Sequence, residues 1–127
     1  MSIYLYRNYT EWENDEAFEV LEGKLSFTRR GLVVIETVED EKNYKQILSF
    51  DRIFAIVYKL PYGYLGYAKE INVFKDEYSW SNSEPDASFQ GEIKEDESSD
   101  RYVSFDTADG YKQIISLSKV FAVTYEG

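Results

Sequence analysis

The chain has 127 residues, of which 24 are acidic and 14 basic, a formal net charge of −10, and neither Cys nor His. This excess of negative charge argues against direct binding of nucleic acid, because phosphate contacts need cations. The absence of Cys and His removes the thiol nucleophile, the thiolate metal site and the commonest general base. Apolar residues make up 43% of the chain, which is enough for a folded core.

The N-terminal stretch Ile3–Arg7 is rich in Tyr, Ile and Leu and predicts a short strand. It lacks the long apolar core of a signal peptide, and no later run approaches the length that a membrane span needs. We therefore expect a cytoplasmic protein that does not contact a membrane.

Two structures fit the acidic stretch that follows. In the first, a capping box at Thr10–Glu13 begins a short helix that Gly23 ends. In the second, a loop leads into a hairpin that pairs residues 18–20 with residues 25–27 across Gly23. The pattern does not separate the two.

The rest of the first half is typical of short antiparallel strands separated by charged or Gly-containing turns. The last of these strands is apolar on both faces, which indicates burial on both sides or a place at an interface. The predicted strands are Lys24–Thr28, Leu32–Val38, Tyr44–Ser49 and Ile53–Lys59.

An internal repeat organises the chain. Tyr44–Tyr58 returns as Tyr111–Tyr125, with eight of the fifteen positions identical. Earlier positions match at a spacing of 68, and the spacing falls to 67 by Tyr111, which indicates the loss of one residue in a turn. Repeats at a fixed spacing are typical of duplicated structural units.

We therefore predict an all-β protein made of two tandem five-stranded antiparallel units, residues 1–60 and 69–127, joined by a Tyr/Gly connector at 61–68. Each unit has a short helix or loop after its first strand. The strand pattern resembles small SH3-like or Sm-like barrels and bacterial pleckstrin-homology-like domains, a resemblance that implies a fold and no function.

Two units of this size are expected to pack across a pseudo-two-fold, since each alone has a marginal core. The shared core is then predicted to contain Phe54 with its match Phe121, and Ile56 with its match Val123.

The densest acidic run is the first candidate site, formed by Glu95, Asp96, Glu97 and Asp100. Its spacing lacks the central Gly of a calcium loop, so no metal site is predicted. Solvated surface charge is the usual meaning of such a run. The alternative is a contact with a basic partner.

Aromatic residues form the second candidate site, since Trp and Tyr are enriched at binding hot spots. They are Trp12, Trp80 and the connector residues Tyr62, Tyr64 and Tyr67. The alternative is structural: each Trp covers the core of its unit, and the connector Tyr fold back over the junction between units.

No nucleophile with its base, phosphate loop or cofactor motif is present, so we do not expect an enzyme. The sequence favours a small acidic protein that binds and inhibits another protein, most simply a basic nucleic-acid-binding enzyme such as a nuclease. In size and charge it is similar to phage anti-restriction and anti-CRISPR proteins and to the immunity proteins of nuclease toxins.

Two other classes of function stay open. One is a structural or adaptor module of a phage or bacterial complex, assembled as a ring or a homodimer. The other is a small-ligand or peptide-binding module with an aromatic cleft.

Overall fold

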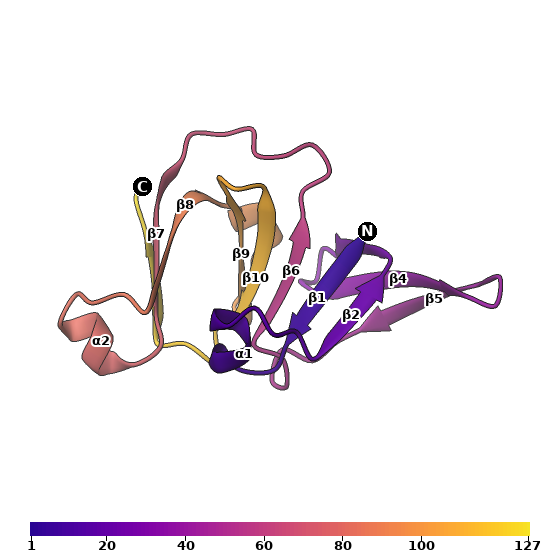
Figure 1. Ribbon diagram of the computed structural model, residues 1–127, viewed down its shortest axis with the longest axis horizontal. Helices are drawn as coiled ribbons and strands as arrows, with labels where there is room; N and C mark the ends of the chain where they lie inside the picture. The colour runs from indigo at the N-terminus through magenta and orange to yellow at the C-terminus, as the bar shows by residue number, and fades with distance from the viewer.

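A computed structural model describes residues 1–127 and confirms the prediction of an all-β protein (Figure 1). The strands are β1 (Ser2–Tyr6), β2 (Glu19–Glu22), β3 (Lys24–Phe27), β4 (Val33–Glu39), β5 (Lys42–Ile47), β6 (Ala55–Lys59), β7 (Lys69–Phe74), β8 (Ala87–Ile93), β9 (Tyr102–Thr107), β10 (Tyr111–Ser116) and β11 (Ala122–Tyr125). The helices are α1 (Tyr9–Glu13), α2 (Glu77–Ser81) and the 3-10 turn η1 (Glu95–Glu97).

The strands form one eight-stranded sheet, in the order β11-β7-β8-β9-β10-β6-β1-β2, and one three-stranded sheet, β3-β4-β5. Every neighbouring pair is antiparallel. The hairpin of β4 and β5 extends from one end of the molecule, and β7 lies at the opposite end with the C-terminal strand beside it (Figure 1).

The two short helices begin with the same kind of cap. The side chain of Asn8 accepts a hydrogen bond from the Glu11 N–H at 2.9 Å, and Asp76 accepts one from the Ser79 N–H at 2.8 Å. Such caps satisfy a backbone donor that the first helical turn leaves free. A short helix after the first strand of each half, one of the two predicted alternatives, is present. Its predicted bounds in the first half, from Thr10 to Gly23, are wrong, because Asn8 caps it earlier and α1 ends at Glu13.

Gly23 separates β2 from β3 without reversing the chain. β2 pairs with β1 and β3 pairs with β4, so the predicted hairpin of residues 18–20 with 25–27 is wrong. A Cβ at Gly23 would lie 2.1 Å from the Glu36 oxygen, and one at Gly91 would lie 2.0 Å from the Asp106 oxygen. Only Gly allows the neighbouring backbone to approach so closely.

β6 lies between two apolar clusters. Ile56 and Tyr58 belong to one cluster, whereas Ala55 and Val57 belong to the other. All four side chains are buried, so the predicted burial of this strand on both faces is confirmed. The first cluster also contains Ile114 from the second half of the chain, and the two halves therefore share their cores.

The predicted pseudo-two-fold is wrong. Such an axis would pair β11 with β5 wherever β6 pairs with β10, yet β11 pairs only with β7 and β5 only with β4. The predicted shared core is wrong at Phe121 for the same reason. Phe54 is 1% exposed beneath the second half, whereas Phe121 is 48% exposed.

The spacing of the repeat changes in two connections rather than one. Leu25 pairs with Ile35, and Ile93 pairs with Phe105. The connection from β8 to β9 is therefore two residues longer than the matching connection from β3 to β4. The turn from β9 to β10 is shorter by three residues than the turn from β4 to β5, because Lys112 pairs with Asp106 and Lys45 with Glu36. Two residues gained in one connection and three lost in the other give the net loss of one residue seen in the sequence.

Candidate functional site

The predicted acidic run lies on and after η1, and its members are not equally free. Asp96 and Asp100 are exposed. Glu95 accepts a hydrogen bond from the Tyr125 hydroxyl at 2.8 Å. Glu97 forms an ion pair with Lys112. The run therefore combines exposed charge with a structural contact.

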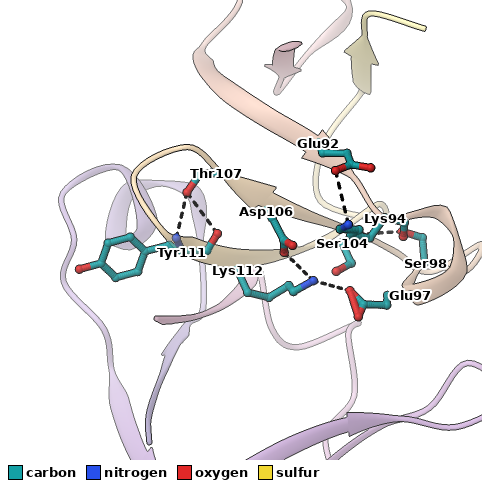
Figure 2. Close-up of polar contacts among 9 residues, drawn as sticks. All are labelled: Glu92, Lys94, Glu97, Ser98, Ser104, Asp106, Thr107, Tyr111 and Lys112. Carbon is teal, nitrogen blue, oxygen red and sulfur yellow. Dashed lines mark hydrogen bonds and ion pairs between the residues drawn. The ribbon is translucent and has the colours of Figure 1, made fainter. Parts of the chain in front are cut away.

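Figure 2 shows Lys112 between Asp106 and Glu97. The Lys112 ammonium lies 2.6 Å from Asp106 Oδ1, and its side chain is buried. Tyr58 of β6 lies directly across from Lys112, and burial raises the pKa of Tyr58 to about 12, with a further contribution from Glu97 and Asp106. A buried cation needs such partners, so this cluster stabilises the junction of β6 with β10.

The sequence contains no signal that Lys112 is buried, because Lys is usually exposed. Its match in the repeat, Lys45, is exposed in the structure. Lys45 lies 3.8 Å from Glu36, its direct partner on the neighbouring strand β4. The same residue type at the same place in the repeat is therefore buried once and solvated once. No group of three or more potential metal ligands is present.

The connector Tyr residues do not cover the junction as a set. Tyr62 and Tyr67 are almost fully exposed. Tyr64 is half-buried and donates a hydrogen bond to the Tyr67 carbonyl at 2.7 Å. Burial raises the pKa of the Tyr64 hydroxyl, with a contribution from Glu92.

The two Trp residues have different environments. The ring centroid of Trp12 lies 5.4 Å from that of Phe54 and 5.7 Å from that of Phe89, so Trp12 packs between the halves. Trp80 lies 5.4 Å from Phe121 but is nearly half exposed. Trp12 therefore covers a core as the structural interpretation expected, whereas Trp80 is available at the surface.

An open groove of about 1290 Å³ lies beside Trp12, where α1 and β2 approach β8 and β10. Aromatic and acidic side chains dominate its lining, and Lys59 is the only Lys or Arg there. The aromatic members are Tyr4, Tyr6, Tyr9, Trp12, Phe89 and Tyr111, and the carboxylates are Glu13, Asp15, Glu16, Asp86 and Asp109. Among the predicted site residues only Trp12 lines this groove.

Several groove residues hold one another in place. The Tyr6 hydroxyl donates to Asp15 Oδ1 at 2.6 Å, and the Tyr9 hydroxyl donates to the Asp86 carbonyl at 2.9 Å. Burial raises the pKa of Tyr6, and it raises the pKa of Tyr9 to about 12. These two hydrogen bonds fix the positions of the Tyr6 and Tyr9 rings in the groove wall.

The carboxylates of Glu13 and Glu16 have no hydrogen-bond or ion-pair partner within the chain, although both line the groove. The sequence offered no direct signal for this surface, because its walls come from four separate segments: residues 1–20, 57–61, 86–89 and 109–113. Only their pairing in the sheet brings these segments together.

Comparisons of the chain with protein-family models, with curated proteins and with solved structures find no match. Neither of the helices has the length or the apolar character of a membrane-spanning segment.

Proposed function

We propose that the chain is a non-catalytic protein that takes a basic segment of a partner protein into the acidic aromatic groove and thereby inhibits that partner. The observation that carries this proposal is the lining of the groove, where five carboxylates accompany a single lysine. Aromatic rings beside carboxylates provide both contact area and cation–π partners for Lys and Arg side chains.

The partner class follows from charge. A net charge of −10 attracts basic proteins over long range and raises their association rate. Nucleic-acid-binding enzymes carry exposed basic segments for phosphate contacts, so a nuclease is the simplest target. Anti-restriction, anti-CRISPR and toxin-immunity proteins are the classes of inhibitor in which such a role fits.

A peptide titration tests the groove directly. Trp12 lines the groove and Trp80 does not, so a Trp80→Phe background leaves one fluorescent reporter there. We expect a Lys/Arg-rich peptide to change the Trp12 emission in a saturable way, with weaker binding at high salt. A peptide of the same length rich in Asp and Glu serves as the control ligand.

Two matched variants separate the groove from the acidic run. Changing Glu13→Gln with Glu16→Gln removes two groove charges, and changing Glu95→Gln with Asp96→Gln removes two charges at η1. The groove pair is expected to weaken binding at least fivefold and the η1 pair to leave it within twofold. The reverse result places the contact on the acidic run, and no saturable change with the basic peptide overturns the proposal.

We further propose that the chain is an internal duplication of residues 1–60 and 69–127. Support comes from backbone contacts at matched positions. The Phe54 N–H donates to the Tyr6 carbonyl at 2.8 Å, and the Phe121 N–H donates to the Phe74 carbonyl at 2.9 Å. The blocked Cβ positions at Gly23 and Gly91 match in the same way.

A further inference from the structure

The two halves of the chain are joined by one strand pair, which we name the inner junction: β6 (Ala55–Lys59) paired with β10 (Tyr111–Ser116). β6 is the last strand of the first half, and β10 is the next-to-last strand of the second half. The contact is therefore heterologous, because the two halves use different surfaces to meet.

The two strands that match β10 and β6 in the repeat, β5 and β11, each have only one neighbouring strand. β5 matches β10 in the repeat and pairs only with β4, and β11 matches β6 and pairs only with β7. These two edges lie at opposite ends of the molecule (Figure 1). An unpaired edge presents free N–H and C=O groups that a further strand can satisfy.

Apolar side chains on the free edges are exposed where their matches are buried. Ile114 on β10 is 0% exposed, whereas Ile47 on β5 is 59% exposed. Tyr58 on β6 is 7% exposed, whereas Tyr125 on β11 is 47% exposed. Ile47 and Tyr125 therefore have the apolar character of their buried matches at the inner junction, although both are exposed to water in a single copy of the chain.

The Trp–Phe pair beside β6 is likewise covered, whereas the matching pair beside β11 is not. Trp12 and Phe54 are covered by the second half, and the Trp12 indole donates to Gln113 Oε1 at 3.0 Å. Trp80 and Phe121 have the same 5.4 Å centroid separation but no covering strand. Gln46 of β5 matches Gln113, so a second copy carries the acceptor that Trp80 lacks.

We infer that copies of this chain associate head to tail, with β5 of one copy pairing antiparallel to β11 of the next in the register of the inner junction. This inference rests on the proposed duplication and is independent of the groove. The inner pairs Gln113 with Val57 and Ile114 with Ile56 become Gln46 with Thr124 and Ile47 with Val123. Each copy offers one β5 edge and one β11 edge. The same contact therefore repeats from copy to copy and generates a closed ring or an open filament.

Charge disfavours the symmetric alternative. An antiparallel pair of two β5 strands that sets Asn43 of one copy across from Tyr44 of the other also sets Lys42 across from Lys45 on both sides, and like charges across a strand pair are destabilising. Pairing with β11 instead places Tyr44 across from Glu126, at the position where Tyr111 lies across from Lys59.

Disulfide cross-linking tests the register, because the chain has no Cys of its own. Directly opposed residues in antiparallel strands have Cβ atoms about 4.5–5.5 Å apart, close to the range that a disulfide needs. We expect an equimolar mixture of Gln46→Cys and Thr124→Cys proteins to form a linked dimer under mild oxidation. Neither variant alone is expected to do so.

An internal control makes a negative result informative. Val57→Cys combined with Gln113→Cys in one chain places the same pair at the inner junction and is expected to close within the monomer. If it closes while the mixture stays unlinked, the head-to-tail inference is wrong and the inner pairing stands. Failure of the control itself overturns both the inner register and the inference, and homodimers of Gln46→Cys alone overturn the inference in favour of a symmetric contact.

Mass measured by light scattering tests the unmodified protein. The mass is expected to rise above that of the monomer with concentration, reaching a plateau for a ring or continuing to grow for a filament. Ile47→Asp is expected to weaken this association at least tenfold. Leu65→Asp, which adds the same charge at an exposed connector position, is expected to leave it within twofold. A monomer at millimolar concentration overturns the inference.

Discussion

The indole nitrogen of Trp12 donates a hydrogen bond to the amide oxygen of Gln113 at 3.0 Å, across 101 positions of sequence. The bond connects α1 of the first half to β10 of the second, beside the inner junction. Since this hydrogen bond is partly buried, removing the Gln113 acceptor leaves the Trp12 N–H without a partner.

Replacing Gln113 tests this link. Gln113→Leu is expected to destabilise the fold by about 1–2 kcal/mol, because the Trp12 N–H loses its acceptor. Gln46→Leu at the matched position is expected to change the stability of the monomer by less than about 0.5 kcal/mol. Urea unfolding at a protein concentration that keeps the chain monomeric measures both, and equal losses would show that the Trp12 contact contributes nothing.

The buried ion pair provides a second prediction. Lys112→Met leaves Glu97 and Asp106 without their cation at the inner junction and is expected to cost about 3 kcal/mol. Lys45→Met removes only an exposed pair with Glu36 and is expected to cost less than about 0.5 kcal/mol. The midpoints of chemical denaturation compare the two, and a small loss for Lys112→Met would mean that the methionine packs as well as the ion pair.

Phe54 and Phe121 test the unequal burial of the repeat. Phe54→Ala removes a fully buried ring and is expected to destabilise the monomer by about 3–5 kcal/mol. Phe121→Ala removes a half-exposed ring, and its expected cost is about 1 kcal/mol since less apolar area returns to water. Thermal unfolding measures both. Equal losses would contradict the difference in covering that the structure describes.

Alkaline pH is expected to destabilise the protein through its buried Tyr residues. Burial raises the pKa of Tyr9 and Tyr58 from 10.0 to about 12. A folded-state pKa above the unfolded one means that the fold favours the protonated form. The associated stability is complete below pH 10 and is lost as pH rises from about 10 to about 12.

Urea midpoints measured at successive pH values above 8 follow this loss. Tyr58→Phe is expected to make the decline shallower, because one buried hydroxyl no longer has to ionise. Tyr62→Phe changes an exposed side chain and is expected to leave the pH dependence as it is. A flat profile between pH 9 and pH 11.5 would contradict the burial of these hydroxyls.

Much of the local structure is determined by short-range pattern. Alternation and β-branched residues predict the strands around Val33–Glu39 and Lys24–Phe27 to within one or two residues. Apolar residues on both faces of β6 predict its burial, since no single covered face can accommodate them. These features depend on neighbours in sequence, and the sequence contains them directly.

The direction of the chain at Gly23 depended on a contact that no local pattern contains. Gly permits both a hairpin turn and a straight passage under another strand. The backbone of Glu36 lies where a Cβ would otherwise stand, and that position is set by the pairing of β3 with β4. The hairpin prediction therefore failed at a residue where tertiary structure chooses between two allowed conformations.

The sequence by itself determined a set of strands and a repeat, and with them which residues are interchangeable between the halves. Only the tertiary structure decided which member of each matched pair is buried. Ile114 and Ile47 both follow the segment Tyr-Lys-Gln, yet only Ile114 is paired with β6 and buried. The physical reason is that burial depends on non-local strand pairing, which joins β6 to β10 and leaves β5 and β11 as edges.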